Sequence, residues 1–398
     1  MHEAIDEAVV LAGRFGDPAL VVRAARVATT DALWPARAYG ERNDAVIATI
    51  RQALDAVPAT GPEASPDALA VRCRLLLALA SECYYAVSPE EIESIAAEAI
   101  ATARLVGDDG LLAEALLGAT VSADRRSGAE WRRSWCEEGL SLTERTGDVR
   151  MRTNLRMLLT AARCELGDLP DATDDLVDVV RVARAERLYL VEMVALTLQH
   201  SWAAMRGNEE EIATTFADVT ACFERVSTAH KVDIVGGAAL FVPLWCPGVE
   251  APPPEAVLRF LDEASIPVGP AGAILALRTA QPDVARTLFD RYGIELDTDN
   301  WFSPFLWALG AELGLGLGEP DVAARAYARL APYAGGCVLS GTSPAHGPVD
   351  AYLALAAAAV GETDLATEHA DTALDLIRAW RIPQVERWLL DLRERHGF

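Results

Sequence analysis

A spaced set of glycines constrains this chain more than any other feature of its sequence. The step from Gly107 to Gly147 equals the step from Gly167 to Gly207, and each of these glycines is followed by Asp or Asn. Glycine ends a helix because it accepts the left-handed conformation, and a short acid or amide caps the helix that follows. The interval predicts one helix pair for about every 40 residues, which is typical of a helical-repeat solenoid.

The segments between these breaks carry apolar residues at helical spacing. In the segment 169–183 they recur every three or four positions: Leu169, Ala172, Leu176, Val179 and Ala183. Alternating patterns typical of strands are scarce. We therefore expect an all-α chain, folded as a tetratricopeptide-like right-handed superhelix of antiparallel helix pairs.

Two further signals concern the later repeats. The segment 282–285, Pro-Asp-Val-Ala, recurs at 320–323. Its small alanine predicts close packing of the second helix of a pair against the first. The segment 246–255 is rich in proline, which favours an extended linker. We expect it to divide the array into an N-terminal part, 1–249, and a C-terminal part, 250–398, of the same solenoid.

Composition limits the classes of partner. The 398 residues carry a formal net charge of −24, which opposes direct contact with nucleic acid or with an anionic membrane surface. Seven cysteines at wide spacings, with no CxxC, argue against a disulfide framework or a zinc site. The chain shows no signal peptide and no transmembrane segment, so we expect a cytoplasmic protein. The partners expected are a protein or peptide, or a small-molecule effector, and the chain could form a homodimer.

Residues 298–380 carry a resemblance to a known family. Their order is an aromatic opening (300–307), a segment ending Leu-Ala-Pro-Tyr-Ala-Gly (330–335), a Gly-rich turn, and a final repeat that begins at Gly361. This order resembles the C-terminal tetratricopeptide region of large ATP-dependent regulators of the LuxR type. Related solenoids occur in some actinobacterial antibiotic regulators and in multidomain cyclases. The resemblance implies a sensor and interaction arm.

The chain departs from the full pattern of that family. It contains no GxxxxGK[ST] motif, which excludes ATP binding of the P-loop type. No terminal helix-turn-helix with a basic face is visible. The resemblance therefore extends only to the effector-binding arm.

Candidate binding residues gather around the turn at 335–346. They are Trp301, Phe305, Tyr333, His346 and Tyr352. The aromatic residues 301–307 either line a ligand pocket or pack between helices, with Trp301 and Phe305 on one helical face. The apolar segment 235–245 is either a second pocket wall or a buried helix kinked before Pro243.

No catalytic set, metal site or cofactor site is evident in the sequence. A serine–histidine pair of Ser343 and His346 would need a strand-to-helix elbow, so loop and helix-capping chemistry is the favoured interpretation there. We expect a non-catalytic regulatory solenoid that binds an effector on its concave face. The alternatives are a small-molecule receptor with its pocket near Trp301 and the 335–346 turn, or an enzyme of secondary metabolism built on a helical solenoid.

Overall fold

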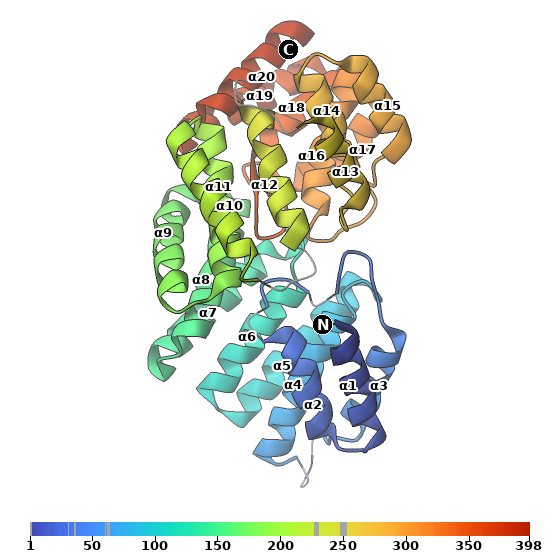
Figure 1. Ribbon diagram of the computed structural model, residues 1–398, viewed down its shortest axis with the longest axis vertical. Coiled ribbons are helices and arrows are strands. Elements are labelled where there is room, and N and C mark those ends of the chain that lie inside the picture. The colour runs from blue at the N-terminus through green and yellow to red at the C-terminus, as the bar shows by residue number, and fades with distance from the viewer. Residues whose placement is uncertain are drawn as a thin grey trace. The chain divides into compact units, whose positions relative to one another are not determined.

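A computed structural model describes residues 2–30, 32–35, 37–59, 61, 64–226, 231–246 and 253–398. Helices dominate these residues, which confirms the predicted all-α repeat fold (Figure 1). The chain forms two compact units, Met1–Leu159 and Thr160–Phe398. The expected joint near residue 250 depends on the segment 246–255. Residues 247–252 of that segment lie outside the described part of the chain, so the joint stays a prediction.

The first unit is a series of helices in which α1 pairs with α2, α4 with α5, and α6 with α7. The helices α2, α4 and α6 also contact one another in series, as neighbouring repeats of a solenoid do. The elements are α1 (His2–Arg14), α2 (Pro18–Thr29), α3 (Asp44–Asp55), α4 (Pro66–Glu82), α5 (Pro89–Val106), α6 (Asp109–Ser122), η1 (Arg126–Gly128), α7 (Ala129–Thr146) and the first part of α8 (Val149–Glu165).

The second unit repeats the same arrangement, with α10–α11, α14–α15, α16–α17 and α18–α19 as pairs. Its later elements are α9 (Leu169–Ala185), α10 (Tyr189–Arg206), α11 (Glu209–Phe223), α12 (Lys231–Trp245), α13 (Pro254–Glu263), α14 (Gly269–Arg278), α15 (Pro282–Tyr292), α16 (Ser303–Leu317), α17 (Pro320–Leu330), η2 (Ala331–Tyr333), β1 (Cys337–Leu339), β2 (Ala345–Pro348), α18 (Val349–Ala359), α19 (Thr363–Trp380) and α20 (Pro383–His396).

The predicted pairs of a glycine and a following Asp or Asn account for where many of these helices begin and end. The helices α5, α7, α9 and α11 begin at a constant interval, at positions 89, 129, 169 and 209. Gly107, Gly147 and Gly207 end helices in the left-handed conformation. Asp108 and Asn208 then accept backbone N–H bonds as helix caps, whereas Asp168 makes no such bond.

Small residues let the helices of a pair approach closely, as the repeated Pro-Asp-Val-Ala segment predicted. Ala323 of α17 is fully buried against Gly314 of α16. A Cβ added to Gly314 would lie only 2.6 Å from the Cβ of Ala323. The close contact therefore depends on glycine at one position and alanine at the other.

The second unit also closes on itself, unlike a purely linear array. The last helix, α20, contacts α10 and α12, which lie much earlier in the chain. Trp202 of α10 meets Trp380 of α19 edge to face, with ring centroids 6.3 Å apart. In an open solenoid each repeat contacts only its neighbours. These long-range contacts therefore give the second unit an enclosed interior.

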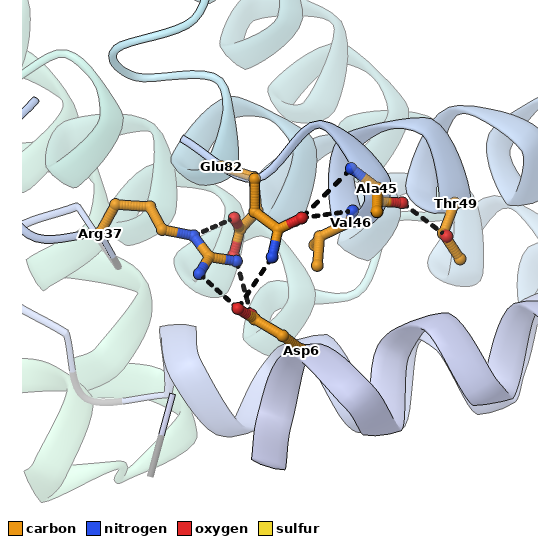
Figure 2. A network of polar contacts seen from close by, with 7 residues as sticks. Asp6, Arg37, Ala45, Val46, Thr49 and Glu82 are labelled. Carbon is orange, nitrogen blue, oxygen red and sulfur yellow. Dashed lines mark hydrogen bonds and ion pairs between the residues drawn. The ribbon is translucent and has the colours of Figure 1, made fainter. Parts of the chain in front are cut away.

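A buried arginine anchors the start of the first unit (Figure 2). Arg37 donates from Nη1 and Nη2 to the carboxylate of Asp6, at 2.8 and 2.6 Å, and from Nε to Glu82 at 2.6 Å. Asn43 donates to the same Asp6 carboxylate and caps α3 through its carbonyl oxygen. The network thus joins α1, α3 and α4 through side chains with satisfied hydrogen bonds.

Three further findings concern membrane-spanning helices, metal ligands and cysteines. In the part of the chain that the structure describes, no helix is both long and apolar enough to cross a membrane. No group of three or more potential metal ligands occurs among those residues either. All seven cysteines are buried as free thiols, where a cysteine packs as a small apolar side chain.

Candidate functional site

A largely apolar cavity of about 90 Å³, partly open to solvent, lies in the second unit. Its walls come from α10, α12, α13, α14, α16 and the β1–β2 hairpin. Five phenyl or indole side chains and one imidazole line it: Phe241, Phe260, Trp301, Phe302, Phe305 and His346. Apolar cavities with few polar groups are the usual form of small-molecule sites in proteins.

Two consecutive glycines of α12 play different parts in this cavity. A Cβ on Gly236 would lie 2.1 Å from the ring of Phe260, so glycine is required for α13 to pack there. A Cβ on Gly237 would meet no atom within 4 Å. Gly237 lines the cavity, and its missing side chain contributes to the open space. The segment 235–245 thus belongs to a largely buried helix, α12, which has Pro243 inside it and also forms one wall of the cavity. Each of the two alternatives that the sequence left open therefore describes part of it.

The irregular turn after α17 is an antiparallel hairpin that the sequence pattern did not predict. Its strands pair Cys337 with Pro348 and Leu339 with Ala345, with a bulge between. Both strands are buried along their whole length, so they show no alternation of polar and apolar residues. Burial on both faces explains why no strand was expected here.

Main-chain hydrogen bonds fix this hairpin beside the cavity. The N–H of Gly341 donates to the carbonyl of Trp301 at 2.7 Å. The N–H of Ala345 donates to Oγ of Ser201 in α10 at 3.0 Å. The hairpin thus connects the aromatic segment before α16 with a helix from the start of the second unit.

Aromatic rings of the cavity form a continuous series of contacts, each ring touching the next. Trp301 and Phe302 meet edge to face at 5.3 Å between centroids, and Phe302 and Phe305 do so at 5.4 Å. The imidazole of His346 stacks on Phe305 at 4.0 Å with a 23° angle between planes, and lies 5.1 Å from Phe241. These rings form a preformed aromatic wall.

His346 is one of the polar groups of the cavity, together with Asp233 and three hydroxyl groups. Its Nε2 shares a hydrogen bond of 2.9 Å with Oγ of Ser340, and the residue is only 3% exposed. Burial, aided by the positive charge of Arg278, holds the pKa of His346 well below its usual range. The imidazole is therefore neutral at pH 7.

The structure brings together three of the five predicted site residues. Trp301, Phe305 and His346 all line the cavity. Tyr333 instead stacks on Trp307, with centroids 6.2 Å apart. Tyr352 is buried behind the hairpin, where its hydroxyl donates to the carbonyl of His346 at 2.8 Å. Tyr333 and Tyr352 do not line this cavity.

Two details of the sequence prediction were wrong. The helix α16 begins at Ser303, so Trp301 precedes it in a turn and does not share a helical face with Phe305. His346 lies in β2 and caps no helix, since the residue at the N-cap of α18 is Pro348. Its hydrogen-bond partner is Ser340 instead of Ser343. The buried hairpin accounts for both differences, because it carries His346 into the interior and holds Trp301 outside the helix.

Phe241, Phe260 and Ser340 are site residues that sequence reasoning did not name individually. Phe241 belongs to the segment 235–245, whose apolar character was the available signal. Phe260 lies in α13, on the other side of the proline-rich stretch. No local pattern links Phe260 to the site, because only the tertiary fold brings α13 beside Gly236.

A cluster next to this cavity joins four helices of the second unit. Arg278 lies between the rings of Trp245 and Trp388, at 4.4 and 4.7 Å from their centroids. It donates to both carboxylate oxygens of Glu312, at 2.8 and 2.7 Å. Cation–π contact and bidentate pairing both stabilise a buried guanidinium. The cluster therefore ties α12, α14, α16 and α20 together.

The first unit has a groove of different character, of about 180 Å³. It runs across α2, α4 and α6, the helices that contact one another in series, and reaches the start of α8. Glu114 lies between two arginines, 3.2 Å from Arg26 and 3.0 Å from Arg74. This groove combines charged and apolar residues, in contrast to the cavity of the second unit.

Comparison with known proteins adds no argument about the fold or the function of the chain. No protein-family model matches the chain, and no curated protein matches it. Among solved structures, the chain is similar to a circular tandem repeat protein with novel repeat topology and enhanced subunit contact surfaces. The similarity covers 99% of this chain and 95% of that one, at 14% identity and a TM-score of 0.24. A score this low carries no argument, so the fold assignment rests on the helices themselves.

Proposed function

We propose that this chain is a ligand-sensing helical-repeat protein that binds a small, uncharged, largely apolar molecule in the aromatic cavity of its second unit. The observation that carries the proposal is the open space beside Gly237, bordered mainly by aromatic rings, with His346 and Asp233 among its few polar groups. An engineered cavity of about 150 Å³ in another protein binds benzene. The cavity here is smaller, about 90 Å³, but it is open on one side, so a ligand of about one ring would lie partly in the cavity and partly at its mouth.

Binding would be linked to the stability of the second unit. The cavity is walled by helices and a hairpin that are far apart in the sequence, so a ligand would contact all of them at once. A ligand that binds only the folded state stabilises it by mass action, by about 2.7 kcal/mol at 100 times its dissociation constant. The hydrogen bond from Ala345 to Ser201 would transmit hairpin movement to α10.

A thermal-shift screen with small neutral arenes and aliphatic alcohols tests this function. Gly237→Leu fills the space and should abolish the shift, whereas Gly237→Ala leaves most of the cavity open and controls for the change in helix propensity. Trp301→Ala removes one wall and should weaken binding. The proposal fails if no compound in the screen stabilises the wild type, or if Gly237→Leu responds as the wild type does.

The groove of the first unit favours a second function, as an interaction surface for an acidic segment of a partner protein. Two arginines share one glutamate there, so positive charge is in excess around Glu114. Glu114→Gln should strengthen capture of acidic peptides from a random display library, and Arg26→Ala should weaken it. Arg23→Ala on the same helix, outside the groove, is the matched control. A selection that enriches neutral or basic peptides would contradict this function.

We also propose, on the resemblance of residues 298–380 alone, that the chain serves as the sensor arm of a transcriptional regulator of the LuxR type. In the native host, deletion of the gene should change transcription of a defined set of genes. Reintroduction of Gly237→Leu should leave that set unresponsive to the effector. An unchanged transcriptome after deletion would contradict the regulatory role, without bearing on ligand binding.

A further inference from the structure

Only one of the two ring nitrogens of His346 forms a hydrogen bond among the described residues. Nε2 bonds to Oγ of Ser340, and the backbone carbonyl accepts from Tyr352. Among the described residues, Nδ1 has no hydrogen-bond partner, although the residue is only 3% exposed and lines the cavity. Nδ1 is not among the fully buried side-chain atoms that lack a partner, so it is accessible from the cavity. A polar atom of a ligand could bond to it there in place of water.

The remaining lining is aromatic, apart from a carboxylate that disfavours anions. His346 and Phe305 are close to parallel, and Phe241 lies against the same imidazole. The carboxylate of Asp233, also in the lining, accepts from the N–H of Ser265 at 3.1 Å and from its hydroxyl. Transfer of an ionised group from water into such a site is strongly unfavourable unless a partner charge awaits it.

We propose that the ligand is a single-ring aromatic compound with one hydroxyl group, a phenol in chemical class, whose ring lies among the aromatic side chains and whose hydroxyl bonds to Nδ1 of His346. This inference rests on the proposed ligand-binding function and deepens it. Ser340 is then a positioning residue, which holds the imidazole through Nε2 and so directs Nδ1 to the ligand.

A hydroxyl satisfies either tautomer of the histidine. If Ser340 donates to Nε2, the proton of the imidazole lies on Nδ1, and the ligand oxygen accepts it. If Nε2 donates to Ser340, Nδ1 accepts the proton of the ligand hydroxyl. A carboxylate or an ammonium group suits only one of these arrangements and also carries a charge into the cavity.

Isothermal titration with benzene, phenol, benzoate and benzylamine tests the inference on the full chain. Phenol should bind about threefold to tenfold more tightly than benzene, which corresponds to one net hydrogen bond. Benzoate should bind far more weakly than benzene, because the lining already holds the carboxylate of Asp233. Benzylamine tests whether that carboxylate recruits a cation, and tighter binding of benzylamine than of phenol would overturn the inference. In His346→Phe, which keeps a stacked ring but has no ring nitrogen, phenol and benzene should bind equally well. In Ser340→Ala the ratio of phenol affinity to benzene affinity should fall towards one.

These titrations distinguish failure of the proposed hydroxyl contact from failure of the proposed ligand-binding function. If benzene and phenol bind equally to the wild type, or if the preference survives in His346→Phe, the assigned hydroxyl contact is wrong although the cavity binds ligands. If neither binds, or if Gly237→Leu binds both as the wild type does, the proposed function itself fails. Tighter binding of benzoate would assign the site to an anion and overturn the inference.

Discussion

The imidazole of His346 lies nearly parallel to the ring of Phe305, with centroids 4.0 Å apart. Phe305 belongs to α16 and His346 to the β2 strand, so this contact joins the hairpin to the helix beside the cavity. The stack fixes the orientation of the one polar ring in an apolar space.

Acidification should destabilise the second unit through His346. Its pKa is depressed in the folded chain, while an unfolded histidine has a pKa of about 6.5. Between these two values the unfolded chain binds more protons, so the free energy of unfolding falls as the pH drops below about 6.5. Urea denaturation at a series of pH values from 7.5 to 5 should show this fall. In His346→Phe the slope should be smaller.

His200 is the control for that experiment. It is also buried, with its pKa lowered by burial, and it bonds to Thr215 and to the carbonyl of Ala238. Some pH dependence should therefore remain in His346→Phe. A slope identical to that of the wild type would show that His346 does not titrate as its environment requires.

Alanine should have opposite effects at two helical glycines of the second unit. At Gly237 the added Cβ meets open space, so Gly237→Ala should stabilise by about 0.5–1 kcal/mol through helix propensity. At Gly314 it would collide with Ala323, and Gly314→Ala should destabilise by about 1–3 kcal/mol through overpacking. Denaturant midpoints of the two variants measure both effects. Equal signs would contradict the close helix pairing.

Removal of Arg37 should be strongly destabilising for the first unit. Its side chain is 8% exposed, and it neutralises both Asp6 and Glu82. Arg37→Met would leave the buried Glu82 carboxylate without its partner, at a cost of about 3–5 kcal/mol. The double variant Arg37→Met, Glu82→Leu should recover much of the loss, as a double-mutant cycle would show. Equal loss in single and double variants would indicate that packing matters more than the charge pair.

Arg278→Lys should destabilise the second unit by about 1.5–3 kcal/mol, the range for a hydrogen bond to a charged group. Lysine keeps the charge but loses both the planar fork that pairs with Glu312 and the stacking between Trp245 and Trp388. Tryptophan emission should also change, because two indoles surround the guanidinium. An unchanged midpoint and spectrum would show that the cluster does not hold the four helices together.

The parts of this fold that the sequence predicted are those set by local chemistry. Gly107 and Asp108 end one helix and cap the next through contacts between near neighbours in the chain. The hairpin at 337–348 was not predicted, because its short strands are buried on both sides and show no period of two. The roles of His346 and Arg278 were also hidden, since their partners lie on helices and strands that only tertiary packing brings together.

The candidate site was predicted only in part, because some of its residues carry a local sequence signal and others are brought to it only by tertiary packing. Trp301 and Phe305 stood out as aromatic residues in a chain that is only 7% aromatic. Phe260 carried no such signal, and its place depends on the absence of a side chain at Gly236. Tyr333 and Tyr352 are near in sequence to the hairpin but face other neighbours.

A crystal structure of the protein soaked in 4-bromophenol shows whether a phenol occupies the cavity, because the anomalous signal of bromine locates the ligand. We expect a bromine peak in the cavity of the second unit, with the phenol oxygen at hydrogen-bond distance from Nδ1 of His346, and no peak there in Gly237→Leu. An empty cavity with bromine elsewhere on the surface, or the same peak in Gly237→Leu, would contradict the proposed ligand site.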